Sequence, residues 1–145
     1  MAILLDTNIL LLVSQPHVPH SPIAARALDV LRGRNETLLI ASQNIVEFWA
    51  VATRPATENG LGFTVDHAMR QVLALKRLFT LLPEQPLQSE WERLVATYRV
   101  AGKNSHDARL VAAMTVHGTR TVLTFNVQDF TSYAEITVLD PRTVV

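Results

Sequence analysis

The sequence contains no cysteine among its 145 residues. Disulfide bonds and thiolate metal sites are therefore excluded, which fits a reducing compartment. Long apolar runs are also missing, because the run at residues 9–13 is only about a quarter of the roughly 20 residues that span a bilayer. The first residues lead into Asp6 without a basic segment or a small-residue cleavage site. We therefore expect no transmembrane helix, no signal peptide and a cytoplasmic location.

An excess of charge of either sign is absent as well. Thirteen Lys and Arg residues balance thirteen Asp and Glu residues, so bulk positive charge cannot drive binding to nucleic acid. If four acids share one pocket, however, thirteen basic and nine acidic side chains remain elsewhere, and phosphate could still be attracted to the rim. The chain length suits one α/β core, so we expect a single domain over residues 1–145.

Apolar stretches of strand length alternate with stretches of helical periodicity. Strands are expected at residues 2–5, 37–41, 80–82, 121–123 and 136–139, and helices at residues 21–31, 43–53, 65–78, 89–101 and 105–117. Serines or threonines at the helix starts are expected to act as N-caps, namely Ser21, Ser42, Thr64, Ser89 and Ser105. Residues 54–63 form the longest expected loop. The alternation predicts an α/β fold with a mostly parallel central sheet covered on both faces.

Four acidic residues stand at or after the expected strand ends. Asp6 ends the first strand, and Glu47 lies early in the helix after the second strand. Asp107 lies in the first turn of a late helix, and Asp129 follows the strand at 121–123. Groups past the carboxyl ends of parallel strands gather in one crevice, where clustered carboxylates repel one another unless a cation neutralises them. Oxygen-only ligation favours one or two Mg²⁺ or Mn²⁺ ions over zinc.

Each acid also has a purely structural interpretation. Asp6 and Asp107 could cap helices or complement the helix dipole, and Asp129 could be an ordinary loop residue. Glu47 fits such an interpretation less well, because the helix around it is almost wholly apolar. Burying a carboxylate there without a partner would cost several kcal/mol.

Four segments resemble, in order and spacing, the PIN-domain family and its VapC-type toxins. These segments are Asp6-Thr7-Asn8-Ile9-Leu10, then Asn44-Ile45-Val46-Glu47-Phe48, then Ser105-His106-Asp107-Ala108 followed by Leu110-Val111-Ala112-Ala113, and finally the residues 124–130. The resemblance covers essentially the whole chain. It implies an α/β/α sandwich and a Mg²⁺- or Mn²⁺-dependent endoribonuclease. It also implies a protein that is often a homodimer and is inhibited by a small antitoxin from the same operon.

The resemblance also assigns roles to residues. The family's catalytic and metal-binding quartet maps onto the four acids above, with Asp6 and Asp107 as the most dependable ligands. Asn8, Thr124 and Asn126 match polar positions that support such a site. The cation would polarise a phosphodiester oxygen and lower the pKa of a bound water that attacks phosphorus in line. The identity of the RNA stays open.

Other motifs carry weaker signals. His17 and His20 lie in a proline-flanked loop without cysteine partners, so we interpret them as exposed loop residues and not as a zinc site. His106 could contact a phosphate or simply face solvent. The sequence has no Gly-x-Ser-x-Gly elbow, no Gly-x-Gly-x-x-Gly motif after the first strand and no Walker loop. Serine hydrolase, dinucleotide and NTP chemistry therefore have no basis.

Two alternatives to a ribonuclease stay open. In phosphatases of the haloacid dehalogenase type, an aspartate after the first strand is the nucleophile, but a second aspartate is expected where Asn8 stands. A PIN-like module could instead bind RNA or a partner without cutting it.

Several apolar stretches could form a partner surface or fill the core. They are Phe48 with Trp49, the loop residues Leu61 and Phe63, and the helix at residues 65–79. An antitoxin segment could fill an apolar groove there and send a basic side chain to the acidic pocket.

Overall fold

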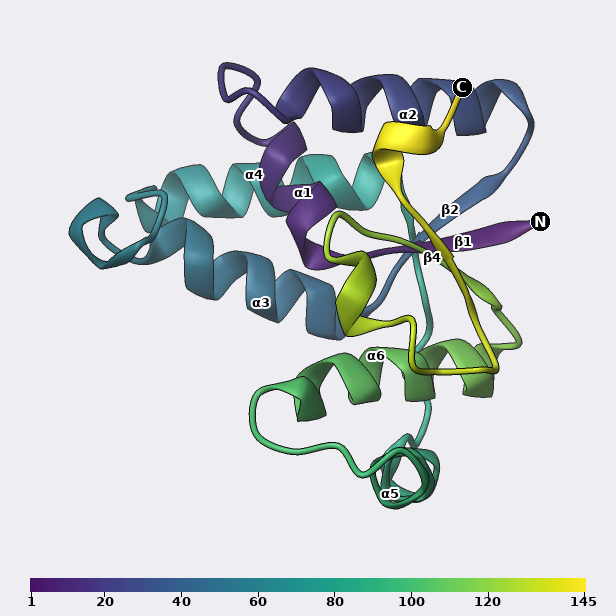
Figure 1. Ribbon diagram of the computed structural model, residues 1–145. Helices are drawn as coiled ribbons and strands as arrows, with labels where there is room; N and C mark the ends of the chain where they lie inside the picture. The colour runs from purple at the N-terminus through teal and green to yellow at the C-terminus, as the bar shows by residue number, and fades with distance from the viewer.

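The computed structural model describes residues 1–145 and contains one five-stranded sheet in the order β3-β2-β1-β4-β5 (Figure 1). All four strand pairs are parallel. The strands are β1 (Ala2–Leu5), β2 (Thr37–Ile40), β3 (Thr80–Leu81), β4 (Thr121–Leu123) and β5 (Thr137–Leu139). The predicted mostly parallel sheet is therefore confirmed, and no strand runs antiparallel.

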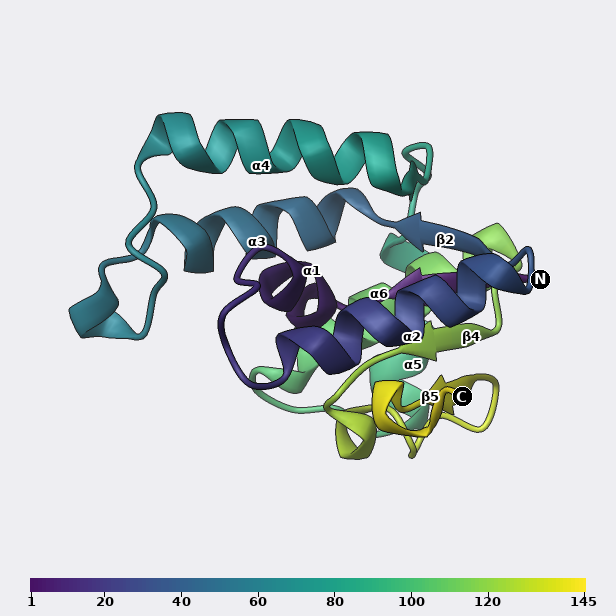
Figure 2. The same cartoon turned by 90° about the horizontal axis from the view of Figure 1, so that it is seen from above.

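Helices cover both faces of this sheet in an α/β/α arrangement. The helices are α1 (Thr7–Val13), α2 (Ser21–Gly33), α3 (Ser42–Thr53), α4 (Val65–Leu78), α5 (Gln88–Thr97) and α6 (Asn104–His117). Three short 3₁₀ helices join them: η1 (Ala56–Glu58), η2 (Val127–Asp129) and η3 (Pro141–Thr143). Helices α1 to α4 lie on one face, and α5 and α6 lie on the other (Figures 1 and 2). No helix has the length and apolar character needed to cross a membrane.

Strand β1 lies at the centre of the sheet and is buried on both faces. Ile3 and Leu5 belong to the core cluster beneath α1 to α4, whereas Leu4 belongs to the cluster beneath α5 and α6. This division follows from the side-chain period of two along a strand. Burial on both faces explains why β1 reads as a continuous apolar run and not as an alternating one.

The apolar segment at residues 9–13 belongs to α1, a helix that the sequence did not predict. The Asp6 side chain caps this helix by accepting a 2.8 Å hydrogen bond from the Thr7 N–H. Ile9 and Leu10 are fully buried. A helix of seven residues completes only two turns, so its periodicity is too short to recognise.

The capping prediction is confirmed at one helix and wrong at the others. Thr64 accepts a 3.0 Å hydrogen bond from the His67 N–H at the start of α4. The four serines expected as N-caps instead lie inside the first turn of their helices: Ser21, Ser42, Ser89 and Ser105. At α3, the Asn44 side chain accepts a 2.8 Å hydrogen bond from the Ala41 N–H and supplies the polar contact. Helix α5 also ends at Thr97, before the predicted end at residue 101.

The connection between α3 and α4 is a loop, as expected, and it contains η1. Backbone hydrogen bonds from Leu61 N–H to Val51 and from Phe63 N–H to Ala52 hold it against the end of α3. Leu61 and Phe63 pack against the core, and Phe48 is fully buried, so Phe48 cannot belong to a partner surface. The connection lies at the far end of α3 and α4 from the sheet (Figures 1 and 2).

Candidate active site

Asp6 and Thr124 leave the sheet side by side. The register of β1 and β4 pairs Leu5 with Leu123, so the next residue on each strand stands at the same sheet edge. Thr124 is fully buried, and Asp6 is only 7% exposed. Thr124 Oγ1 donates a 2.7 Å hydrogen bond to Asp6 Oδ2, while the Thr7 N–H donates to Oδ1. The Asp6 carboxylate is therefore held by the neighbouring strand and by the first turn of α1.

The three supporting residues predicted from the sequence lie around this carboxylate in different ways. Asn8 Nδ2 donates to Asp6 Oδ2 at 3.3 Å and to Thr124 Oγ1 at 3.2 Å. Asn126 contributes its backbone N–H, which donates to Thr124 Oγ1 at 2.9 Å. The Asn126 side chain is exposed and makes no hydrogen bond. Asn8 and Thr124 thus contact Asp6 directly, and Asn126 acts only through its main chain.

Glu47 is held from two elements, although it lies on an apolar helix. Thr7 Oγ1 donates a 2.7 Å hydrogen bond to Glu47 Oε1, and Gln43 Nε2 donates to Oε2 at 3.3 Å. Asn44 Nδ2 donates to the same Thr7 oxygen at 3.1 Å. These contacts supply the pairing that a half-buried carboxylate requires.

Sequence reasoning did not single out Thr7, Gln43 or Asn44. The available signal was helical spacing, because Gln43 and Asn44 stand four and three residues before Glu47 and so share its helix face. The contact from Thr7 depends on α1 packing against α3, and nothing in the sequence indicated that packing.

Asp107 and Asp129 complete the acidic group from the other side of the sheet edge. Asp107 lies half-buried in the first turn of α6, and Asp129 is exposed at the end of η2. Neither carboxylate accepts a hydrogen bond within the protein. Burial, followed by the negative charges of Asp6, Asp129 and Glu47, raises the pKa of Asp107 to about 7, although Lys103 opposes this shift.

The pKa of Asp6 is also raised, chiefly by burial. Hydrogen bonds from Thr124 and Thr7 oppose the shift, while the charges of Glu47 and Asp129 add to it. The pKa values of Asp6 and Asp107 are thus both raised in part by acids on other elements. That the four acids form one catalytic and metal-binding site stays a prediction.

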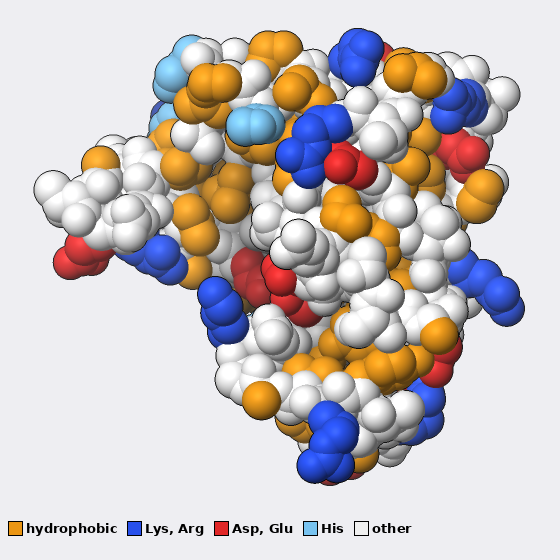
Figure 3. Space-filling view, in the orientation of Figure 1, with side chains coloured by type: hydrophobic (Ala, Val, Ile, Leu, Met, Phe, Trp, Pro, Cys, Tyr) orange, Lys and Arg blue, Asp and Glu red, His pale blue; other side chains and the backbone are white.

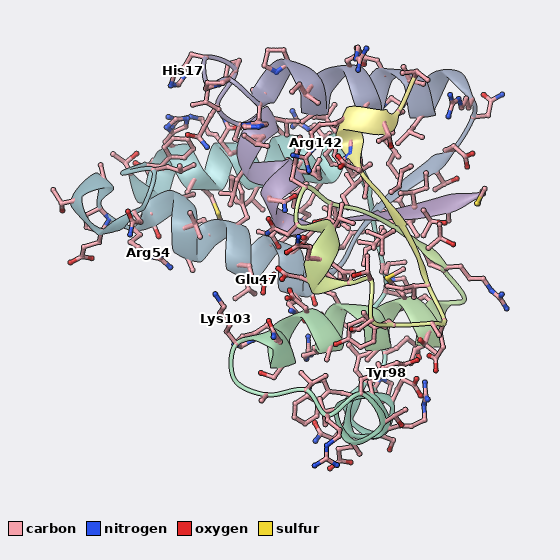
Figure 4. The ribbon with its side chains drawn as sticks, viewed as in Figure 1. His17, Glu47, Arg54, Tyr98, Lys103 and Arg142 are labelled. Atoms are coloured by element: carbon pink, nitrogen blue, oxygen red, sulfur yellow. The ribbon has the colours of Figure 1, made fainter.

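Acidic side chains gather in a recess near the middle of one face (Figure 3). Figure 4 places Glu47 in this recess, on the part of α3 that faces α6. Lys103 extends from the start of α6 toward the same recess (Figure 4). A basic side chain therefore stands at the rim of a negatively charged hollow.

The four acidic side chains have the right ligand atoms for a hard divalent cation. Their positions in the structure do not yet form a complete metal site. All four side chains offer carboxylate oxygens, the ligands that Mg²⁺ and Mn²⁺ prefer. As the side chains stand, no three acidic or histidine residues converge closely enough to hold one ion. A bound cation would also oppose the repulsion that adds to the effect of burial on the pKa values of Asp6 and Asp107.

The histidines stand outside this set. His20 packs edge-on against Phe125, with 5.5 Å between the ring centroids, and both His17 and His20 are exposed. This agrees with the loop interpretation. The His106 side chain is exposed, and its carbonyl accepts a 2.8 Å hydrogen bond from Gln43.

Sequence comparison gives a family and a named relative. The PIN domain family model matches residues 3–136. Ribonuclease VapC24 of Mycobacterium tuberculosis is 31% identical over 144 residues, which cover 96% of each chain.

Solved structures share the fold at lower identity. The structure of VapBC2 from Rickettsia felis, bound to a DNA fragment from its promoter, contains a chain that matches with a TM-score of 0.73. That match has 16% identity and covers 97% of this chain and 98% of the other. VapC20 of Mycobacterium tuberculosis, a toxin that cleaves the sarcin–ricin loop, matches with a TM-score of 0.56 and 18% identity, over 83% and 86% of the two chains. The chain therefore belongs to the PIN-domain family and is a relative of the VapC ribonucleases.

Proposed function

We propose that this protein is a metal-dependent endoribonuclease that hydrolyses RNA phosphodiester bonds, with Asp6, Glu47, Asp107 and Asp129 as its catalytic and metal-binding residues. The observation that carries the proposal is the Asp6 carboxylate, which Thr124 and the Thr7 N–H hold at the carboxyl ends of β1 and β4. Burial and the charges of acids on other elements raise the pKa values of Asp6 and Asp107 at this edge. Membership of the PIN-domain family and the relative named as a ribonuclease support RNA as the substrate. Residues 1–145 would form one PIN domain that acts in the cytoplasm.

Mg²⁺ or Mn²⁺ would be held by the four carboxylates and would supply neutralisation of charge on the phosphate and a lowered pKa for the attacking water. The chain's own contribution is to fix these carboxylates. Thr124, Asn8 and the Thr7 N–H orient Asp6, and such partners of ligands commonly change metal affinity or activity by about 10- to 100-fold. The chain has no cysteine, so we assign the attack on phosphorus to water and not to a thiolate.

The direct test is RNA cleavage by the purified protein with Mg²⁺, with Mn²⁺ and with a chelator. We expect cleavage only with metal, and no cleavage by the Asp107→Asn variant. Sequencing of the new RNA ends would identify the target. A wild-type protein that binds RNA but leaves it intact under all three conditions would instead support a non-cleaving module.

The phosphatase alternative is tested in the same samples. A haloacid dehalogenase-type enzyme would release inorganic phosphate from a small phosphomonoester. Asn8 is engaged with Asp6 and Thr124 as a hydrogen-bond donor, a role that an ionised aspartate could not fill. We therefore expect no release of phosphate.

We also propose that the protein forms a homodimer and is inhibited by a small antitoxin. Support comes from the VapBC2 match, which is a toxin–antitoxin complex, and from large apolar side chains exposed on α3 and α4: Val46, Val65, Met69, Leu73 and Leu78. An antitoxin segment could cover this surface and send a basic side chain to the acids.

Two measurements test the partner proposal. Light scattering should give about twice the 16.1 kDa chain mass. Co-expression of the neighbouring small open reading frame should restore growth of cells that the protein alone arrests. A harmless monomer would contradict the toxin proposal but not the nuclease proposal.

A further inference from the structure

A groove runs from the acidic recess along the junction of α3, α6 and the segment before α5. Two adjoining depressions form it: one of about 460 Å³ is lined partly by Glu47, and one of about 450 Å³ is lined partly by Trp91. His106 and Arg109 line both depressions, so the two are continuous. The groove therefore connects a proposed metal ligand with a partly exposed aromatic ring.

Arg109 stands where the two depressions meet. Its Nη1 donates a 3.0 Å hydrogen bond to Gln43 Oε1, and Gln43 Nε2 donates to Glu47 Oε2. The bond to Gln43 is the only hydrogen bond of the Arg109 side chain. A guanidinium has five N–H donors, so four remain available. Arg109 is exposed and takes part in no ion pair. An exposed cation without an ion-pair partner thus lies in the groove and is linked to Glu47 through Gln43.

We propose that this groove binds the RNA strand beside the scissile bond and that Arg109 binds one of its phosphates. The inference rests on the proposed ribonuclease function and adds the path of its substrate. A guanidinium fork matches two phosphate oxygens, and charge-assisted contacts of this kind are stronger than neutral ones. The recess itself repels phosphate, so a cation at its exit would position the strand.

Trp91 marks the far end of the groove and favours a single-stranded substrate. Its indole Nε1 donates a 2.9 Å hydrogen bond to the Ser105 carbonyl, which fixes the ring beside the groove. Unpaired bases stack on partly exposed aromatic rings, whereas paired bases are not available for stacking. A strand that crosses Arg109 could therefore place a base at Trp91.

The groove also contains an exposed carboxylate, Glu84, which lines the depression next to Glu47. A phosphate in the groove would be repelled by Glu84. Removal of this charge should therefore strengthen RNA binding, which is the opposite of the effect expected at Arg109. Substitutions of Glu84 and Arg109 should thus change the affinity for RNA in opposite directions.

The experiment measures binding of a fluorescent single-stranded RNA of mixed sequence and about 12 nucleotides, by anisotropy and in a chelator that prevents cleavage. We expect Arg109→Gln to weaken binding about tenfold and to reduce the slope of log affinity against log salt by about 0.7. Arg109→Lys keeps the charge and should keep the slope. Glu84→Gln should tighten binding severalfold. Arg120→Gln is the matched control, because Arg120 is an exposed arginine just before β4, at the opposite end of the sheet.

Three results would overturn the inference: wild-type protein that binds RNA no more tightly than Arg109→Gln, an equal loss in Arg120→Gln, or weaker binding by Glu84→Gln. Complete absence of binding falls under the first of these. Cleavage of total RNA by the wild-type protein with metal is measured in parallel. Cleavage combined with unaffected binding by Arg109→Gln rejects the groove and retains the ribonuclease. Arg109-dependent binding without cleavage rejects the ribonuclease and retains an RNA groove.

Discussion

Thr124 Oγ1 donates a 2.7 Å hydrogen bond to Asp6 Oδ2, and this bond joins the carboxyl ends of the neighbouring strands β1 and β4. Replacing Thr124 by Val removes the donor and nearly keeps the shape of the side chain. We expect Thr124→Val to lower metal affinity or cleavage by about 10- to 100-fold, because Asp6 loses the contact that orients it. Cleavage rates measured across a series of Mn²⁺ concentrations would show the loss.

Thr124→Ser is the matched control, since it keeps the hydroxyl and should retain most of the activity. Both variants should keep the circular dichroism spectrum of the wild type. A Thr124→Val protein with wild-type rates and metal dependence would show that this bond does not position Asp6 for catalysis.

Asp107→Asn should abolish RNA cleavage, because it removes a charged ligand from the proposed site. The same change should leave the fold intact and, without metal at pH 8, should raise the melting temperature. The reason is that the Asp107 carboxylate is half-buried and repelled by three other acids. Cleavage assays and thermal denaturation on one preparation measure both effects. Full activity in Asp107→Asn would remove the basis of the proposed quartet.

The sheet and the neighbourhood of the acids could be predicted because both depend on local patterns. Strand β1 is a continuous apolar run that stops at a charged residue, and a strand buried on both faces has that pattern. Parallel strands then bring Asp6 and the residues after β4 to one edge. No knowledge of side-chain packing was needed for this step.

The contacts that hold the acids could not be predicted in the same way. Thr7 reaches Glu47 only because the short helix α1 packs against α3, which brings together residues 40 positions apart. Gln43 joins α3 to α6 through the His106 carbonyl, and that approach depends on how the two helices pack against the sheet. The prediction of serine N-caps was wrong at four helices for a related reason. In the sequence, a serine inside the first turn of a helix looks the same as a serine at the N-cap.

Gly60→Ala should destabilise the connection between α3 and α4. A Cβ atom at Gly60 would overlap the backbone carbonyl of Arg54, which cannot move without disturbing the end of α3. We expect the free energy of unfolding to fall by about 1–3 kcal/mol, as for other overpacked sites. Gly33→Ala is the control, because a Cβ atom at Gly33 would meet no other atom within 4 Å and the φ of Gly33 is not positive. Urea denaturation should separate the two variants, and equal stability would contradict the tight turn.

The metal-free protein should become more stable as the pH falls from 8 to 5.5. The pKa of Asp107 is raised from 3.8 to about 7 in the folded state, chiefly by burial and then by the neighbouring acids. In this pH window the folded state therefore takes up a proton that the unfolded chain does not bind. The free energy of unfolding rises as the proton is bound, and this gain is absent above the folded-state pKa. The raised pKa of Asp6 acts in the same direction.

A divalent cation should oppose this pH dependence. Mg²⁺ or Mn²⁺ would bind the ionised acids of the folded state, so the rise in melting temperature at millimolar metal should be larger at pH 8 than at pH 5.5. Thermal denaturation at both pH values, with metal and with a chelator, measures the effect. Asp107→Asn is the control, because it lacks the titrating group and should show a smaller difference between the two pH values in both conditions. A metal shift that is equal at both pH values in the wild type would indicate that the cation binds away from the acids.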